Sequence, residues 1–408
     1  PTITLPPMKS PPIVLLRTLP LIAGLVLTGR SEDAPAPTVT GEHVVVARAP
    51  GYTLGWPANV GLAWRWGNEI LVGFTAGFHK YYHRGGHTFD QTRPYEAWFS
   101  RSLDGGKTWK MERHASHGVT IKPESLTFPP GGAPVEFDQR INFTHPDFAL
   151  LCLMEGARKE GRAWIQYSYN RGKTWSKRYW LPLFGFDTLH ARTDYLVKSR
   201  DECQLFLTGS HDQAGAISSM EVFTARTTDG GKHWQREASI GSGNANMPST
   251  VRLDAKKLVT ATRTARPIDL SKPAGARNRE PFIRIHTSDD DGKSWKLVYT
   301  LDTWRRDGGE DPDGDHGNPP SLIILKDGRL ALTYGRRGAY RVCVKFSSDG
   351  GVTWGPEFAI RSGAGSWDIG YPRTTQRDDG KVVTVYYWTD SDKTERYIAA
   401  TIWEAPAR

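Results

Sequence analysis

Several residues that could bind or transform an anionic ligand stand at the ends of strand-like segments. Three arginines could together hold a carboxylate, because each guanidinium forms two parallel hydrogen bonds that the ammonium of lysine cannot reproduce. Tyrosine, histidine and aspartate side chains at comparable points could transfer protons. The candidate residues are Arg192, Arg263 and Arg336 together with Asp90, His145, Asp194, Asn318 and Tyr371.

The elements that must position these residues follow from an eight-residue motif that occurs five times. The sequence Ser-Leu-Asp-Gly-Gly-Lys-Thr-Trp begins the series at 102–109, and related sequences follow at 168–175, 227–234, 288–295 and 347–354. The steps between successive tryptophans are 66, 59, 61 and 59 residues. Each copy predicts a hairpin turn, since its Asp or Asn can accept backbone N–H bonds and its Gly tolerates positive φ. We interpret the motif as structural and not as a calcium loop.

A second repeat, which reads strand, tight turn, strand, lies upstream of each turn motif. Its clearest copies are 320–334 and 372–386, and weaker copies start at Pro57, Pro146, Asp194 and Pro248. Six starts in residues 39–408 give units of about 62 residues, which matches the step between tryptophans. The sequence therefore predicts an all-β fold, a six-bladed β-propeller of four-stranded antiparallel sheets.

The last unit lacks a turn motif of its own. Residues 397–403 would be its third strand, and the outer strand is best supplied by residues 43–48 from the start of the chain. Pairing of the two ends closes the ring and leaves no long free edge. Residues 39–408 are accordingly expected to form one domain.

Closure of such a ring brings distant residues to one mouth, the end where each first strand starts and each second strand finishes. Turn motifs lie at the opposite end. A concave, charged mouth is the default site for a propeller. Predicted first strands follow Trp56, His145, Arg192, Met247, Asn318 and Tyr371, predicted second strands end near Arg263 and Arg336, and Asp90 lies in the loop that follows the second strand of the first blade.

The five turn motifs in a six-unit ring resemble those of the sialidase (neuraminidase) superfamily, over residues 39–408. The turns are specific for that propeller class but not for its chemistry. The resemblance implies an arginine triad that grips a carboxylate, a tyrosine nucleophile with a glutamate partner, and an aspartate acid/base. It implies Tyr371 as nucleophile, Asp90 as acid/base, and Arg263 and Arg336 as the second and third arginines.

Two departures indicate a divergent member. The first arginine of the superfamily lies in an Arg-Ile-Pro triplet, where this sequence has Gly55-Trp56-Pro57. The glutamate partner of the tyrosine would fall near Met247, which cannot act as a base. Arg192 could replace the missing arginine, and His145 or Asp194 the missing base.

These observations suggest a hydrolase of the exo-sialidase type, which removes a terminal anionic sugar such as sialic acid from a glycan. One alternative is a polysaccharide lyase, in which His145 and Tyr371 move protons while arginines neutralise a uronate carboxylate. Another is a non-catalytic propeller that binds glycans. The Cys and His spacings match no zinc site, and we expect no metal or cofactor.

Composition excludes several other classes. The net charge of +9 is spread without a block of five or six like charges, so we expect no nucleic-acid partner. Residues 1–38 resemble an export signal, with Met8-Lys9, a mostly apolar segment at 13–28 and a small-residue cleavage pattern at 34–36. We therefore expect a secreted or periplasmic protein. We expect no integral membrane span, because no uninterrupted apolar run reaches about 18 residues.

Overall fold

Regular structure in the computed structural model is almost entirely antiparallel β-strand. The residues that it describes are 36–82, 87–90, 92–93, 95–113, 118–119, 132–155, 161–211, 220–266, 280–302, 319–391 and 393–408. The expected export signal lies outside the described residues except for 36–38, and the candidate residue Asn318 also lies outside them. No helix in this part of the chain has the length and apolar character that crossing a bilayer requires.

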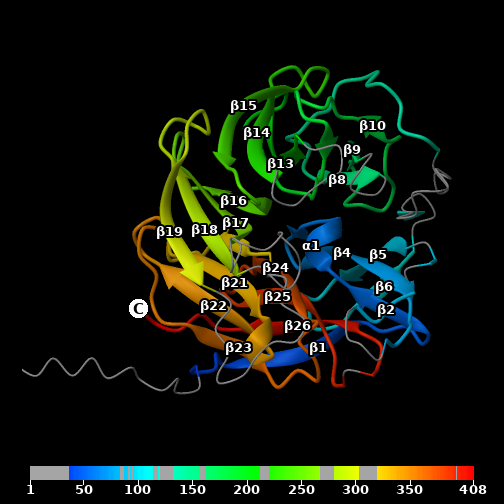
Figure 1. Ribbon diagram of the computed structural model, residues 1–408, viewed down its shortest axis with the longest axis vertical. Coiled ribbons are helices and arrows are strands. Elements are labelled where there is room, and N and C mark those ends of the chain that lie inside the picture. Colours follow the sequence, from blue (N-terminus) through cyan, green and yellow to red (C-terminus); the bar gives the residue numbers. More distant parts are fainter. Residues whose placement is uncertain are drawn as a thin grey trace, which may run out of the picture. The chain divides into compact units, whose positions relative to one another are not determined.

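The strands form six sheets, one for each predicted blade, and the blades succeed one another in chain order around a common centre (Figure 1). Blade 1 contains β2 (Tyr52–Gly55), β3 (Ala63–Trp66), β4 (Glu69–Phe78), β5 (Tyr95–Ser102), β6 (Lys110–Glu112) and β7 (Gly118–Val119). Blade 2 contains β8 (Ala149–Glu155), β9 (Arg162–Ser168) and β10 (Tyr179–Trp180). Blade 3 contains β11 (Thr188–Leu189), β12 (Tyr195–Val197), β13 (Cys203–Ser210), β14 (Met220–Thr227) and β15 (Gln235–Gly241).

The remaining blades each have four strands. Blade 4 contains β16 (Asn246–Arg252), β17 (Leu258–Arg266), β18 (Glu280–Ser288) and β19 (Lys296–Asp302). Blade 5 contains β20 (Ser321–Ile324), β21 (Leu330–Arg336), β22 (Arg341–Ser347) and β23 (Phe358–Ser362). Blade 6 contains β24 (Gly370–Gln376), β25 (Val382–Trp388), β26 (Tyr397–Trp403) and β1 (Gly41–Ala47). The described helices are α1 (Pro57–Val60) and the 3-10 turn η3 (Arg337–Ala339).

The predicted closure of the ring is confirmed. Strand β1 pairs antiparallel with β26, from Gly41 opposite Trp403 to Ala47 opposite Ile398 (Figure 1). Apolar side chains from both ends of the chain consequently share one buried cluster. The all-β, six-bladed fold expected from the repeats is the fold that the structure has.

Blades 1 and 2 depart from the expected repeat. Pro57 begins the short helix α1 and not a strand, and β2 and β3 both pair with β4. Strand β8 pairs with β9, the strand that leads into the turn motif at 168–175, so β8 is a second strand. The prediction that a first strand starts at Pro146 is therefore wrong.

The turn motifs are held by hydrogen bonds within each copy. In the first copy Asp104 Oδ1 accepts the backbone N–H of Lys107 and of Thr108, at 3.0 and 2.9 Å. The hydroxyl of Thr108 donates to Asp104 Oδ2 at 2.6 Å, and the indole N–H of Trp109 donates to the carbonyl of Gly106 at 2.8 Å. Gly106 has φ +92°, which a residue with a side chain rarely adopts.

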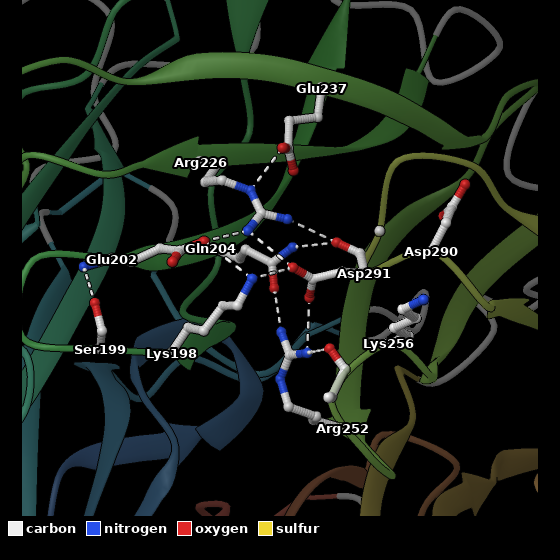
Figure 2. Close-up of polar contacts among 12 residues, drawn as sticks. Lys198, Ser199, Glu202, Gln204, Arg226, Glu237, Arg252, Lys256, Asp290 and Asp291 are labelled. Carbon is white, nitrogen blue, oxygen red and sulfur yellow. Dashed lines mark hydrogen bonds and ion pairs between the residues drawn. The ribbon is translucent and has the colours of Figure 1, made fainter.

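Arginines that immediately precede two of the turn motifs connect neighbouring blades. Arg226 of blade 3 donates from Nε to Glu237 at 2.6 Å, and from Nη1 to Glu202. It also donates from Nη2 to the backbone oxygen of Asp291 in blade 4, at 2.7 Å (Figure 2). The carboxylate of Asp291 in turn lies 2.7 Å from Nη1 of Arg252. We call these residues the Arg226 cluster.

Blade 1 repeats this arrangement. Arg101 donates to Glu69 at 2.6 Å, to Glu112 at 2.7 Å and to the backbone oxygen of Arg171 in blade 2 at 2.9 Å. Arg171 and Asp291 occupy equivalent positions in their turn motifs, and both have left-handed backbones, with φ 60° and 63°. The two clusters are therefore related by the repeat, and each joins one blade to the next.

Arg373 and Asp194 are both buried near the centre of the ring. Arg373 of β24 donates from Nη2 to the carbonyls of Ala58 and Thr193, both at 3.0 Å. The carboxylate of Asp194 accepts the hydroxyl of Thr250 at 2.8 Å. Burial raises the pKa of Asp194 to about 7, even though Arg373 and Thr250 oppose this change. Burial also lowers the pKa of Arg373 to about 10, so both charges are costly here.

Replacing Arg226 by methionine should lower the free energy of unfolding by about 3 kcal/mol, because Glu202, Glu237 and Asp291 then lose the cation that they share. Urea denaturation measures the change. Arg65→Met is the control, since the partner of Arg65, Asp378, is 66% exposed; its cost should stay below about 1 kcal/mol. Equal effects of the two substitutions would contradict a special role for the Arg226 cluster.

Asp194 should make stability depend on pH. Its pKa is raised on folding, so its contribution is present below the unfolded pKa of about 3.9 and is lost as the pH rises through about 7. Relative to Asp194→Asn, the wild-type free energy of unfolding should fall between about pH 4 and about pH 7, by up to about 4 kcal/mol. Denaturant titrations of both proteins at several pH values test this. Parallel pH curves would show that the carboxyl does not titrate in this range.

Candidate active site

Arg263 and Tyr371, two candidates that are far apart in sequence, meet in the structure. Nη1 of Arg263 in β17 donates to the phenolic oxygen of Tyr371 in β24 at 3.1 Å. The same nitrogen lies 3.6 Å from the sulfur of Met247. This hydrogen bond joins blades 4 and 6 at the end of the ring where second strands finish and first strands begin.

Three residues that come before or at the start of an inner segment share an unusual backbone. Trp56, Met247 and Tyr371 have φ of 52°, 52° and 51°, in the left-handed region. Such a conformation costs a residue with a side chain on the order of 1–3 kcal/mol. All three side chains are buried in one cluster although they belong to blades 1, 4 and 6. The closed ring therefore brings these three side chains together in one buried cluster.

The arginine beside the Tyr371 ring is Arg337 and not the predicted Arg336. The guanidinium carbon of Arg337 lies 5.3 Å from the ring centre of Tyr371 and 5.1 Å from that of Trp367. Arg336 instead donates to Glu357 at 2.9 Å, and the hydroxyl of Tyr334 donates to the same carboxylate. Strand β21 ends at Arg336, and Arg337 begins the 3-10 turn η3, where the backbone leaves the strand and carries its side chain over the Tyr371 ring.

Asp368 is the buried anion of the site. It accepts the hydroxyl of Tyr387 at 2.6 Å, and Nδ1 of His87 lies 2.9 Å from the same oxygen. Nη2 of Arg337 and Nε of Arg396 each lie 3.6 Å from the carboxylate. Burial by itself would raise the pKa of Asp368, but His87, Arg337 and Arg396 bring it well below its usual range. Asp368 is therefore ionised at neutral pH.

Sequence patterns gave no sign of His87 or Asp368 as a pair. Both lie outside the strands, and 281 positions separate them. His87 packs edge-on against Trp56, at 4.9 Å between ring centres. The only available signal was the position of His87 in the polar loop that also holds Asp90.

Asp90 is held as a carboxylate in that loop. Its Oδ1 accepts the hydroxyl of Thr92 at 2.7 Å and the backbone N–H of Thr92 at 2.9 Å, and Lys80 lies 3.7 Å away. The hydrogen bonds from Thr92 are the main reason that its pKa is lowered. The neighbouring Phe89 packs against Trp56 at 5.2 Å, so the loop lies against the Tyr371 cluster.

Arg192 and Asp194 connect blades at the centre. Nε of Arg192 donates to Asn59 Oδ1 at 3.0 Å. Asp194 is buried and accepts the backbone N–H and the hydroxyl of Thr250, at 3.3 and 2.8 Å. Both residues thus bind blade 3 to a neighbouring part of the ring. Within the described ranges, no three His, Cys, Asp or Glu side chains are grouped so as to hold a metal ion.

His145 lies at the opposite end of the ring from Tyr371. Its ring centre is 4.7 Å from that of Tyr169, which belongs to the second turn motif, and its Nδ1 accepts the backbone N–H of Asp147 at 3.2 Å. The prediction that His145 lies at the mouth is wrong. It precedes a second strand, β8, and second strands begin at the end where the turn motifs lie.

Comparison with known proteins identifies the family to which this sequence is similar. Residues 148–384 match the family described as BNR repeat-like domain. No curated protein matches the sequence. Among solved structures, a protein of unknown function from Dyadobacter fermentans is 18% identical with a TM-score of 0.62, and the match covers 91% of this chain and 100% of that one.

Glycosidases also share the fold. A Trypanosoma rangeli sialidase mutant with trans-sialidase activity is 12% identical with a TM-score of 0.55, over 90% of this chain and 60% of its own. The GH93 α-L-arabinofuranosidase of Fusarium graminearum, solved with arabinobiose, is 13% identical with a TM-score of 0.52, over 90% and 98%. This chain thus spans about three fifths of the trypanosomal protein. Because the family match covers more than half of the sequence, the chain belongs to the BNR repeat-like domain family, and it shares its propeller fold with sialidases.

Proposed function

We propose that this protein is an exo-acting glycoside hydrolase of the sialidase type, which releases a terminal anionic sugar such as sialic acid from glycans. The observation that carries the proposal is the 3.1 Å hydrogen bond from Arg263 to the phenolic oxygen of Tyr371. The glycosidases that share the fold support a hydrolase of this general type. The character of residues 1–38 supports action outside the cytoplasm.

Tyr371 is the nucleophile in this proposal. Nη1 of Arg263 donates to the phenolic oxygen of Tyr371, so a guanidinium holds in place the oxygen that would attack. The phenolate and Arg263 together carry no net charge. An anionic sugar therefore meets less repulsion than it would from a carboxylate nucleophile, which accounts for the choice of tyrosine.

The charges around Tyr371 favour an anionic substrate. Among the described residues, the guanidinium groups of Arg263 and Arg337 contact Tyr371, and Arg337 and Arg396 both lie 3.6 Å from the carboxylate of Asp368. Arg337, Arg396 and Asp368 are buried, so solvent screens their charges little. These guanidinium groups can attract a carboxylate-bearing sugar, and Arg263, which already contacts Tyr371, is the residue placed to bind it directly.

A lyase is the second candidate, and Met247 favours it. Met247 stands beside Arg263, near the position at which the sialidase resemblance expects a glutamate partner for the tyrosine. Without that base, Tyr371 could instead exchange a proton with a uronate substrate. His145 cannot share this proton transfer, because its place beside the second turn motif keeps it away from the mouth.

Purified protein should hydrolyse a 4-methylumbelliferyl sialoside, and Tyr371→Phe should lower kcat/KM by at least about 10³-fold, because it removes the attacking oxygen. Arg263→Met should mainly raise KM. Tyr299→Phe, in the outer strand β19, is the control and should change neither constant.

Three results would contradict the proposal. Full activity of Tyr371→Phe would exclude the assigned nucleophile. An unsaturated product that absorbs in the near ultraviolet, formed from a uronate glycan, would favour the lyase. Saturable binding to an anionic-glycan panel without turnover would favour a binding protein.

A further inference from the structure

His87 and Asp368 form a histidine–carboxylate pair at the edge of the Tyr371 cluster. Nδ1 of His87 lies 2.9 Å from Oδ1 of Asp368. The His87 side chain is 28% exposed, whereas that of Asp368 is fully buried. One blade supplies the imidazole and another supplies the carboxylate, so the pair exists only because the ring closes.

The charge on Asp368 determines which nitrogen of His87 carries a proton. An ionised carboxylate can only accept hydrogen bonds, so Nδ1 of His87 must donate. The other nitrogen, Nε2, is then the atom through which the ring exchanges a proton with a ligand. The same division of roles between the two nitrogens operates in Ser-His-Asp sites.

Asp368 and three aromatic residues face His87 in the described part of the chain. Aromatic rings of Trp56, Phe89 and Trp367 pack against it, at 4.9, 6.1 and 5.9 Å between ring centres. None of these rings titrates. Among the described residues, Arg337 and Arg396 act on the pair through their 3.6 Å contacts with Asp368.

The His87–Asp368 pair is linked to the proposed nucleophile. Arg337 contacts Asp368 and also lies over the ring of Tyr371. Tyr387 donates to Asp368 and packs edge-on against Tyr371, at 5.9 Å between ring centres. The resemblance to sialidases gives proton transfer to Asp90, but the hydrogen bonds from Thr92 and the nearby Lys80 hold Asp90 as an anion.

We propose that His87 is the residue that gives a proton to the leaving group at the Tyr371 site, and that Asp368 is its positioning residue. This assignment rests on the proposed glycoside hydrolase function. It places the acid on blade 1 and the nucleophile on blade 6, on two sides of one mouth.

The proposed reaction has two chemical steps. The Tyr371 phenolate forms a bond to the anomeric carbon, the glycosidic C–O bond breaks, and its electron pair takes the proton from Nε2 of the His87 imidazolium. Water then bonds to the anomeric carbon, gives a proton to Nε2, and the Tyr371 phenolate leaves. The cycle begins and ends with the phenolate beside Arg263 and with protonated His87.

The test compares two sialosides that differ in their need for a proton. A 4-methylumbelliferyl sialoside has a leaving group that is stable as an anion, whereas sialyllactose does not. His87→Asn should lower kcat/KM for sialyllactose by about 10²–10³-fold, and for the aryl sialoside by less than about tenfold. Imidazole added to His87→Gly should restore turnover of sialyllactose. The control is His233→Asn, in the third turn motif with its side chain 82% exposed, which should match the wild type.

The positioning role of Asp368 is tested by the pH profile. Asp368→Asn replaces the anion beside Nδ1 of His87 by a neutral amide, so the basic limb of kcat/KM should move to lower pH. Tyr387→Phe removes a donor that competes for the Asp368 carboxylate, and the limb should move to higher pH. This second variant keeps the test valid if Asp368→Asn fails to fold, which thermal denaturation reports.

The outcomes separate the two proposals. If the wild type hydrolyses both sialosides and His87→Asn does so equally well, the assignment of His87 is overturned while the proposed function stands. The assignment of His87 is also overturned if Asp90→Asn loses activity on sialyllactose alone and His87→Asn does not. If the wild type cleaves neither sialoside, the proposed function fails whatever the His87 variants do.

Discussion

The site depends on the antiparallel pairing of β1 with β26, which closes the ring. Backbone hydrogen bonds between the two ends of the described chain satisfy an edge that would otherwise remain exposed. Closure also sets the distance between blades 1 and 6, which supply His87 and Tyr371. A ring that opened at this pairing would keep its individual sheets, but the mouth would lose one of its sides.

Buried charges are the second element that holds the blades together. Arg226, Arg101 and Arg373 each bind groups from more than one blade, and Asp368 gathers partners from blades 1, 5 and 6. A buried ion pair adds little net stability compared with an apolar contact, since both charges lose hydration. Its hydrogen bonds are directional, however, and they specify one arrangement of neighbouring blades where apolar packing would accept several. The Arg226 cluster fixes the arrangement of neighbouring blades at the end of the ring where the turn motifs lie, and Asp368 fixes it at the mouth.

Much of this arrangement could be predicted from sequence, because the repeat constrains it. Five turn motifs at near-constant spacing gave the blade number and the closure, and the convergence rule brought Arg263 to the same end as Tyr371. Prediction failed where a blade departs from the repeat, and where two adjacent arginines were candidates for the same role. Blade 2 has an irregular segment before β8, so His145 was assigned to the wrong end. The strand β21 ends at Arg336, and the sequence did not show that the next residue, Arg337 of η3, would lie over Tyr371. The His87–Asp368 contact joins two segments without periodicity, and no pattern in the sequence records it.

The three left-handed residues suggest how such a site changes its chemistry without changing its backbone. Trp56, Met247 and Tyr371 have nearly equal φ, and each points into one cluster from a different blade. The strained backbone is thus a property of the position and not of the side chain. By resemblance, sialidases use arginine, glutamate and tyrosine near these positions, and here only the tyrosine remains. An indole and a thioether in place of two charged groups make that part of the mouth apolar, so charge recognition and proton transfer must come from other elements. Arg263, Arg337 and the His87–Asp368 pair lie where those tasks would have to be done.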